Sequence, residues 1–305
     1  MWRIFSFLLT LAAWCGPASA AAVQHVFIIS LDQGSPDNIA KSEMPVLKRL
    51  AAEGACTWEA NTIVPSLTLP AHVSMLTGVG IQKHQILWNE FDPEKGPLKV
   101  PTIFQIAKAR GLVTAFFAGK NKFKTFQRSD SFDAFFIPAN PNSANIAAIF
   151  AKRVGPLKPS LCFIHFSDPD SAGHKFGVNS PEKLQAMAEA DAALQVILDA
   201  IEAAGLTKSS VIIVTADHGG HDRTPAENAE RQARGEPYQP GTHGSAEWSD
   251  VCIPWIAWGE GVKKNHRITS PVVTYDTAAT ALWLLDLPVP ESFWGRPVTD
   301  AFEKR

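Results

Sequence analysis

The chain has 305 residues, of which 46% are hydrophobic and 19% charged, and its formal net charge is −2 at pH 7. This composition is typical of a globular protein and lacks the polybasic character expected for binding nucleic acid or an anionic membrane. Three cysteines lie after residue 20, so at most one disulfide can form. Cys162 and Cys252 stand within apolar runs, where we expect buried thiols rather than a disulfide framework.

The first twenty residues have the pattern of a secretory signal peptide. Arg3 precedes an apolar core at 4–14, and Ala18-Ser19-Ala20 follows it. The core is shorter than the ~20 apolar residues that span a bilayer. Lipidation at Cys15 is the less favoured alternative. We therefore predict an exported protein, periplasmic or secreted, whose mature part is one catalytic domain (21–305) without a transmembrane segment.

Continuous apolar runs predict the strands of the fold. These runs do not alternate with polar residues, as expected for strands buried on both faces of a parallel sheet. They lie at 26–31, 112–118, 161–166, 211–216 and 252–258.

Helical patterns separate these runs. The clearest spans 180–204, with Ser180 as N-cap, Pro181 at the first helical position and Gly205 beyond the end. A second lies at 276–285. Alternating strands and helices predict an α/β fold with a mostly parallel central sheet sandwiched by helices. The polar, proline-punctuated segment 221–241 is expected to be a mobile excursion, either a substrate lid or an inert loop.

Acidic and histidine residues follow several of the predicted strands. In such sheets ligands bind outside the carboxyl ends of the strands, so residues far apart in sequence are expected to meet there. Taken singly, an aspartate after a strand is usually a cap or turn residue. As a set, the residues predict a metal site: Asp32, Asp168, Asp170, His174, Asp217, His218 and His243.

Three carboxylates and three imidazoles suit a site for two Zn²⁺ ions, although Mn²⁺ or Fe²⁺ accept the same ligands. Thr68 is the candidate nucleophile, because a metal lowers the pKa of an alcohol and holds it for attack. A helix is expected after Thr68, closed by Gly78, and its N-terminus favours anions. Three carboxylates and a threonine alkoxide offset the charge of two Zn²⁺, so the site can accept a phosphate.

Six blocks of sequence resemble the alkaline phosphatase superfamily, and within it the nucleotide pyrophosphatase/phosphodiesterase branch. Their order and spacing cover most of the mature chain, although any one block is a weak signal. The blocks are SLD ending at Asp32, PSLTLPAHVSMLTG at 65–78, HQILWN at 84–89, DPDSAGH at 168–174, TADHGG at 215–220 and THG at 242–244.

The resemblance implies an alkaline phosphatase-like fold and a role for each matched residue. Asp32, Asp217 and His218 would bind one zinc together with the Thr68 oxygen. Asp170, His174 and His243 would bind the other, and Asn89 would hydrogen-bond a nonbridging phosphoryl oxygen. Thr68 would attack phosphorus, and water would later hydrolyse the phosphothreonine. The implied substrate is a nucleotide or another small-molecule phosphate ester.

Several alternatives stay open at this stage. Asp168 competes with Asp170, and His221 with His218 or His243, whereas His72 is expected to be structural. Gln33 and Gln85 stand where the family more often has glycine, and 68–72 reads Thr-Leu-Pro-Ala-His where Thr-Phe-Pro-Asn-His is common. These departures put the preferred leaving group in doubt. Trp88 and Phe91 are equally suited to stacking on that group and to core packing.

Competing functions make different demands on the site. A phosphomonoesterase needs a cation in the pocket for its extra negative charge, for which Lys122, Arg128 or Arg223 are candidates. A sulfatase is disfavoured because no cysteine has the required context, and a metal-dependent phosphoglycerate mutase because a signal peptide precedes the domain. A secreted metal-binding protein without catalysis is the alternative from another class.

Overall fold

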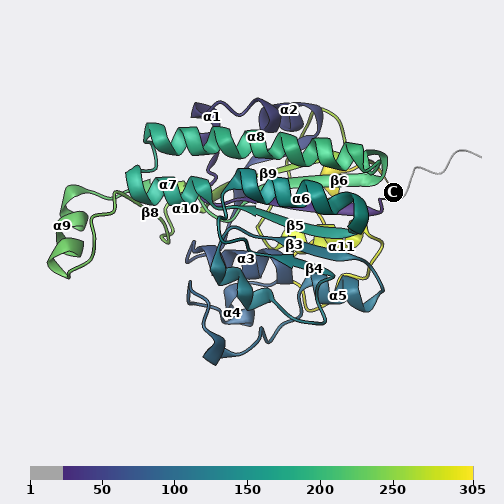
Figure 1. Cartoon of the computed structure of the whole chain (residues 1–305), viewed down its shortest axis with the longest axis horizontal. Coiled ribbons are helices and arrows are strands. Elements are labelled where there is room, and N and C mark those ends of the chain that lie inside the picture. The colour runs from purple at the N-terminus through teal and green to yellow at the C-terminus, as the bar shows by residue number, and fades with distance from the viewer. Residues whose placement is uncertain (1–22, 305) are drawn as a thin grey trace, which may run out of the picture.

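The structure, a computed structural model, describes residues 23–304, so the predicted signal peptide lies outside the described residues. The fold is α/β, as predicted, with an eight-stranded sheet in which β9 alone runs antiparallel to its neighbours (Figure 1). The strand order is β10 (His266–Arg267), β2 (Ala55–Asn61), β9 (Cys252–Gly259), β6 (Ser210–Ala216), β1 (His25–Leu31), β5 (Leu161–Phe166), β3 (Thr114–Phe117) and β4 (Ala134–Phe136).

The direction of β9 corrects one expectation from the sequence. The run at 252–258 was expected to join a parallel sheet, but β9 pairs antiparallel with both β6 and β2. A continuous apolar run reports burial on both faces and carries no information on strand direction. Strands β2, β4 and β10 were not foreseen, because β2 includes half-exposed polar positions and the other two are short.

Two hydrophobic cores lie on opposite faces of the sheet. Side chains of β1 alternate between them: Phe27 and Ile29 face one core, and Val26 and Ile28 the other. Four helices pack on the first core, namely α1 (Pro36–Lys41), α2 (Pro45–Glu53), α6 (Ser143–Leu157) and α8 (Pro181–Ala203). Three pack on the second, namely α3 (Thr68–Thr77), α5 (Ile103–Ala109) and α11 (Asp276–Leu284).

The residues predicted to begin α8 and to end α3 do so in the structure. Ser180 caps α8 by accepting a hydrogen bond from Lys183 N, with Pro181 in the first turn. Helix α3 begins at Thr68 and ends at Gly78, whose φ of 69° is the left-handed geometry that glycine adopts without strain. The remaining helices are short: α4 (Ile81–His84), α7 (Asp168–Phe176), α9 (Pro225–Ala233) and α10 (Trp248–Val251), with 3₁₀ turns η1 (Pro93–Lys95), η2 (Asn121–Phe126), η3 (Thr207–Ser209) and η4 (Thr299–Ala301).

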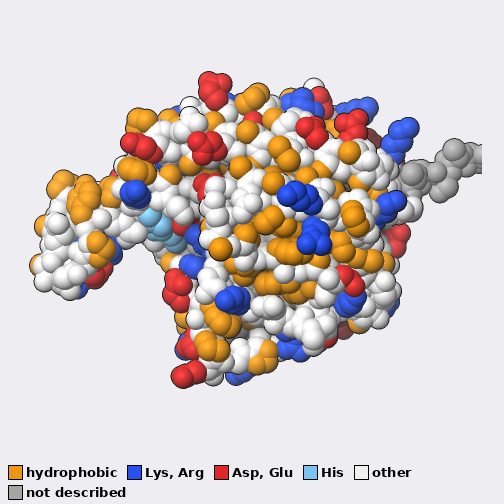
Figure 2. Space-filling view, in the orientation of Figure 1, with side chains coloured by type: hydrophobic (Ala, Val, Ile, Leu, Met, Phe, Trp, Pro, Cys, Tyr) orange, Lys and Arg blue, Asp and Glu red, His pale blue; other side chains and the backbone are white. Residues whose placement is uncertain are grey.

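The segment 221–241 is a helical arm rather than an irregular loop. It leaves the body through β7 (His221–Asp222), forms α9 and returns through β8 (Gly241–Thr242), which pairs with β7. Figure 1 shows the arm projecting from one end of the molecule, and Figure 2 shows histidine side chains where it joins the body. One of its prolines, Pro225, stands in the first turn of α9 after a Thr224 capping box, where proline is tolerated.

Two further expectations concern the described residues. Cys162 and Cys252 are buried free thiols, as predicted, and Cys56 is free as well. Among residues 23–304, no helix combines the length and the apolar character that crossing a bilayer requires. The division of the chain into a signal peptide, one catalytic domain and a lid stays a prediction.

Candidate metal centre and active site

The register of three parallel strands brings the predicted carboxylates to one level. Leu31 of β1 pairs with Phe166 of β5 on one side and with Ala216 of β6 on the other. The residues that follow these strands therefore leave the sheet together at its carboxyl edge. Asp32 and Asp217 are the first residues after β1 and β6, and both are completely buried.

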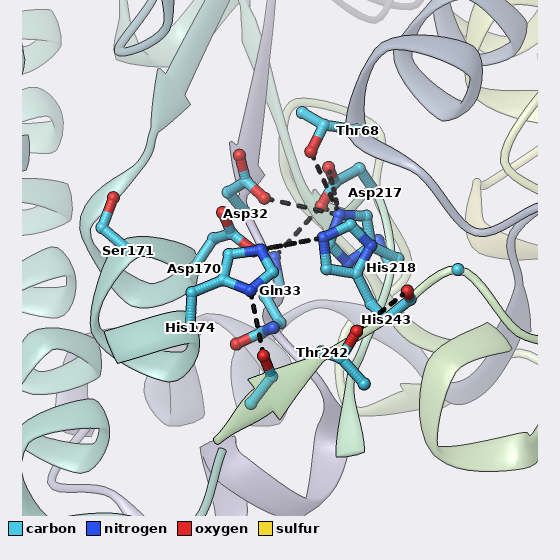
Figure 3. A network of polar contacts seen from close by, with 12 residues as sticks. Asp32, Gln33, Thr68, Asp170, Ser171, His174, Asp217, His218, Thr242 and His243 are labelled. Carbon is cyan, nitrogen blue, oxygen red and sulfur yellow. Dashed lines mark hydrogen bonds and ion pairs between the residues drawn. The ribbon is translucent and has the colours of Figure 1, made fainter. Parts of the chain in front are cut away.

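The first group of ligands comes from α7 and from the segment after β8. Asp170 and His174 lie one helical turn apart, and the Nε2 atom of His174 is 3.3 Å from Asp170 Oδ1. His243 points its Nε2 atom to within 3.6 Å of the same oxygen and 3.1 Å of His174 Nε2. Figure 3 shows the two rings turned toward each other beside Asp170. This convergence suits one metal ion.

The second group surrounds His218. Its Nε2 atom is 3.5 Å from Asp32 Oδ1, 3.2 Å from Asp217 Oδ2 and 3.3 Å from the Thr68 hydroxyl (Figure 3). Asp32, Asp170 and His218 also converge closely enough to hold an ion. Asp170 therefore belongs to both convergent groups. The family resemblance instead assigns Asp217, together with Asp32 and His218, to the second ion. The assignment of each ligand to one ion stays a prediction.

The hydrogen bonds of the three histidines prepare them to bind a cation. The Nδ1 atoms of His174, His218 and His243 bond the carbonyl oxygens of Gly241, Gly219 and Ser66, respectively. Because a carbonyl oxygen only accepts, Nδ1 donates, and in the neutral ring Nε2 keeps its lone pair. In each ring that lone pair faces the carboxylates, which is the usual arrangement of a histidine metal ligand.

Three buried carboxylate oxygens also fit bound metal. Asp32 Oδ1, Asp170 Oδ1 and Asp217 Oδ2 have no hydrogen-bond partner among the described residues. A buried carboxylate oxygen without a partner is costly, and a divalent cation satisfies it. A divalent cation bound between these oxygens and the Nε2 atoms would satisfy both kinds of ligand. The residues present therefore fit two divalent cations.

The electrostatics of the site depend on burial and on neighbouring charges. Burial and the Asp32 carboxylate raise the pKa of Asp170, but Lys120, His174 and His243 hold it at about 2. Burial lowers the pKa of His218, yet Asp217 and Asp32 raise it to about 9. Burial, followed by the charge of His218, lowers the pKa of His243 to about 3. The aspartates are therefore ionised at neutral pH.

Thr68 and Asn89 lie together at the N-terminus of α3. Thr68 is the first residue of the helix and is 1% exposed. Asn89 Oδ1 accepts a hydrogen bond from the next amide, Leu69 N, at 2.9 Å, so the amide nitrogen of Asn89 stays available as a donor. His72 bonds the Thr68 carbonyl and the Ser30 hydroxyl, consistent with the structural role expected for it.

The competing residues have structural partners. Asp168 accepts a hydrogen bond from Ser143 N at the start of α6. His221 pairs with Asp250 at 2.7 Å at the base of the arm. Gln33 and Gln85 have φ values of 59° and 60°, in the left-handed region where glycine is the default residue, which explains the glycine common at these positions but not the glutamines.

Two residues beside the metal ligands were missed by sequence reasoning. Lys120 extends its ammonium to 2.6 Å from Asp32 Oδ2 and 2.5 Å from Asp170 Oδ2. It follows β3, so the strand-end rule that found the aspartates also applies to it. His165, in β5, accepts a hydrogen bond from Gly119 N at Nδ1 and therefore donates from Nε2 to Asp32 Oδ2, at 2.9 Å. The sequence signal that could have identified His165 is its position within the buried apolar strand LCFIHF.

The three residues proposed as cations for a phosphomonoester have different surroundings in the structure. Lys122 is buried two residues beyond Lys120. Arg128 pairs with Asp130 and, with Trp88 and Phe91, lines a cavity of about 310 Å³. Arg223 is held within the arm, where its guanidinium donates to Gln239 O, Gly241 O and Thr242 Oγ1. Arg223 therefore contacts the two residues that precede His243, whereas Lys122 pairs with Glu90.

Comparisons with known proteins show which proteins this chain resembles. The family model described as type I phosphodiesterase / nucleotide pyrophosphatase matches residues 26–121 and 101–234. Ectonucleotide pyrophosphatase/phosphodiesterase family member 7 of Rattus norvegicus is 25% identical over 227 residues, which cover 67% of this chain and 52% of that protein. Bis(5'-adenosyl)-triphosphatase ENPP4 of Bos taurus is 24% identical over 233 residues, covering 67% and 49%. The chain thus spans about half the length of these relatives.

A solved structure shows the same fold. Murine ectonucleotide pyrophosphatase/phosphodiesterase 5, as an inactive variant in complex with AMP, superposes with a TM-score of 0.76 at 17% sequence identity, over 92% of this chain and 100% of that one. Fold and site together define a member of the alkaline phosphatase superfamily in its nucleotide pyrophosphatase/phosphodiesterase branch. Within it, the chain belongs to the type I phosphodiesterase / nucleotide pyrophosphatase family.

Proposed function

We propose that the chain is a phosphoric ester hydrolase that cleaves diesters or pyrophosphates of nucleotides or similar small molecules through a phosphothreonine on Thr68. The observation that carries this proposal is the position of the Thr68 hydroxyl, 3.3 Å from His218 Nε2, beside two groups of metal ligands. The pyrophosphatase/phosphodiesterase and bis(5'-adenosyl)-triphosphatase relatives support the same class of reaction.

Two Zn²⁺ ions are part of the proposal. Asp32, Asp217 and His218 would hold one ion near Thr68, and Asp170, His174 and His243 the other. The convergence of Asp170, His174 and His243 supports the second set, and the distance of 3.2 Å between His218 Nε2 and Asp217 Oδ2 supports the first. When bound, such ions lower the pKa of an alcohol or water and stabilise a leaving oxygen. Oxygen and nitrogen ligands of this kind also accept Mn²⁺ or Fe²⁺, so metal analysis of the purified protein checks the identity.

The chain's own residues account for the remaining steps. Thr68 Oγ forms a bond to phosphorus while the ester oxygen leaves, and water then attacks phosphorus and releases Thr68. The N-terminal amides of α3 and the Asn89 amide nitrogen donate to the nonbridging oxygens. His165 donates a hydrogen bond to Asp32 and orients that carboxylate.

Export is proposed as part of the same function. The signal-peptide pattern of residues 1–20 supports a periplasmic or secreted enzyme that meets its substrate outside the cytoplasm. Amino-terminal sequencing of the mature protein is the measurement, and a mature chain that still begins at Met1 contradicts it.

Substitution of Thr68 tests the proposal. In Thr68→Ala we expect kcat/KM for bis(p-nitrophenyl) phosphate to fall at least about 10³-fold, because the nucleophile is lost, while zinc content stays at the level of the unaltered protein. Thr68→Ser is the matched control and keeps an attacking hydroxyl. A purified chain that holds two zinc ions and hydrolyses no phosphate ester would instead support the non-catalytic metal-binding alternative.

A further inference from the structure

A buried lysine at the start of α8 lies outside both sets of proposed metal ligands. Lys183 is 0% exposed, which is rare for a lysine because its ammonium normally stays in water. Its Nζ atom donates to three oxygens: Gln33 O at 2.9 Å, Gln33 Oε1 at 3.0 Å and Pro169 O at 2.9 Å. These acceptors match the three N–H bonds of an ammonium, so the buried nitrogen is fully hydrogen-bonded.

Both residues that Lys183 bonds are neighbours of proposed ligands in the chain. Gln33 directly follows Asp32 at the end of β1, and Pro169 directly precedes Asp170 in the first turn of α7. Lys183 therefore joins the two segments that supply one carboxylate to each proposed ion. Because it bonds the neighbouring oxygens, the Oδ1 atoms of Asp32 and Asp170 keep no hydrogen-bond partner among the described residues and stay available to a cation.

The Gln33 side chain extends this link to the segments that carry histidine ligands. Its amide group is buried between two glycines: a Cβ atom on Gly173 would collide with Oε1, and a Cβ atom on Gly220 would come within 2.8 Å of Nε2. Gly173 directly precedes His174, and Gly220 lies two residues after His218. In Figure 3, Gln33 lies among the proposed ligands.

The backbone at position 33 favours glycine, so the glutamine needs an explanation of its own. Its φ of 59° is strained for any residue with a side chain. A glycine at this position could make the same main-chain bonds, from its N–H to Asp217 Oδ1 and from its carbonyl oxygen to Lys183. The one hydrogen bond that requires glutamine is that of Oε1 with Lys183. The glutamine and the buried lysine are therefore explained together.

We propose that Lys183 and Gln33 are a positioning pair, which holds the ligand-bearing segments in place and strengthens the binding of both metal ions although neither residue is a ligand. This inference rests on the metal sites of the proposed function. Groups that orient metal ligands typically contribute 10–100-fold to affinity, because they fix the ligands in the geometry of the bound state.

The charge of Lys183 and its hydrogen bonds predict opposite effects on metal binding. A nearby positive charge repels a cation, so loss of the charge alone would strengthen binding. Loss of the hydrogen bonds would release the two segments and weaken it. In Lys183→Met we expect the Kd for Zn²⁺, measured by competition with a chromogenic chelator, to rise about 10–100-fold. Lys48→Met is the matched control, since Lys48 also donates to backbone carbonyl oxygens, of Ser42 and Ala40, in a segment that carries no ligand.

Substitution at position 33 separates the side chain from the backbone. Gln33→Gly relieves the strain of the positive φ but removes the amide, so we expect about 10-fold weaker binding of Zn²⁺. Gln85→Gly is the matched control, because Gln85 has a φ of 60° and an exposed side chain. It relieves the same strain and should leave the Kd unchanged. If Lys183→Met does not fold, this pair of variants decides.

The visible spectrum of the Co²⁺-loaded protein reports the geometry of the ligands and does not depend on turnover. At saturating Co²⁺ we expect the absorption bands to change in Gln33→Gly and Lys183→Met, and to stay unchanged in the two control variants. A substitution that only destabilises the fold would leave the spectrum of the saturated protein as it is.

The outcomes distinguish this inference from the proposed function. A Kd in Gln33→Gly equal to that of Gln85→Gly, tighter or unchanged binding in Lys183→Met, or an unchanged Co²⁺ spectrum overturns the positioning pair, and the hydrolase proposal stands. If the unaltered chain binds two zinc ions and loses affinity in these variants but hydrolyses no phosphate ester, the proposed reaction fails and the pair stands. A chain that binds no metal contradicts both.

Discussion

Single residues in this site are explained by their partners rather than by their type. Asp168 and Asp170 are two positions apart in the same helix, yet Asp168 accepts a hydrogen bond from the first amide of α6 and Asp170 faces two histidines. His72 and His165 engage both ring nitrogens in bonds within the fold. His174, His218 and His243 bond the backbone through Nδ1 and turn Nε2 toward the carboxylates. A residue's contribution is thus decided by which of its polar atoms remains without a partner.

His84 illustrates how a buried histidine links pH to stability. Its Nε2 atom bonds the Ser74 hydroxyl of α3, and its Nδ1 atom accepts a hydrogen bond from Ile86 N, which joins α3 to the turn after α4. Burial lowers the pKa of His84 to about 4. In the unfolded chain a histidine has a pKa of about 6.5, so the unfolded state binds the proton first as the pH falls.

This pKa difference predicts a loss of stability in mild acid. Between pH 7.5 and pH 5, His84 should remove about 1–2 kcal/mol from the free energy of unfolding, and the loss should level off below pH 4, where both states are protonated. Urea denaturation of the unaltered chain and of His84→Gln, in excess chelator, measures the difference. Parallel decreases in the two chains would show that His84 is not responsible.

At the scale of elements, the site depends on strand ends that meet in register. Strands β1, β5 and β6 end together and place Asp32 and Asp217 side by side, with Asp170 supplied by the first turn of α7. Strand β3 ends at Phe117, which pairs with Ile164 and not with the last residue of β5. Gly119 and Lys120 follow it, and Lys120 reaches the same region as the aspartates. Helix α3, which packs on the face of the sheet opposite to α8, adds Thr68.

The close approach at Gly119 can be tested against a glycine that has room. In Gly119→Ala the new Cβ would meet Ser167, so we expect a decrease of about 1–3 kcal/mol in the free energy of unfolding. Gly155, within α6, has no atom within 4 Å of an added Cβ, and Gly155→Ala should stabilise the chain by about 0.5–1 kcal/mol. Denaturant titration of both variants measures this, and equal effects would contradict the assigned contact.

At the scale of the whole molecule, the proposed metal ions connect parts of the chain far apart in sequence. The ligands come from the ends of β1 and β6, from α7 and from the return of the arm after β8. Their buried carboxylates repel one another when no cation is present, because like charges in a low-dielectric interior interact strongly. The metal ions should therefore contribute to global stability as well as to the reaction.

Removal of metal should lower the melting temperature. For a ligand that binds only the folded state, a concentration 100 times Kd stabilises by about 2.7 kcal/mol, which for a domain of this size corresponds to roughly 5–10 °C. Scanning calorimetry before and after chelation should show this decrease, and added Zn²⁺ should reverse it. Added Mg²⁺ is the control, since it prefers oxygen ligands in octahedral geometry. An unchanged melting temperature despite complete loss of zinc would contradict the metal site.

Much of the fold could be predicted from sequence because local signals agree with it. The run before Asp32, the Ser180 cap and the glycine after α3 mark elements that the structure confirms. The antiparallel direction of β9 could not be predicted, because burial alone sets its composition. The helix in the arm was also missed, since its polar residues are typical of both an exposed helix and a loop.

The sequence by itself determined the family, the central strands and a set of residues suited to bind two metal ions around Thr68. The tertiary structure decided which polar atoms of that set are free, because hydrogen bonds to Ser143 and Asp250 engage Asp168 and His221 and leave Asp170 and His243 facing inward. It also brought Lys120 into contact with Asp32 and Asp170. The physical reason is that charge and hydrogen bonding act over a few ångströms in space, and only folding determines which residues lie that close.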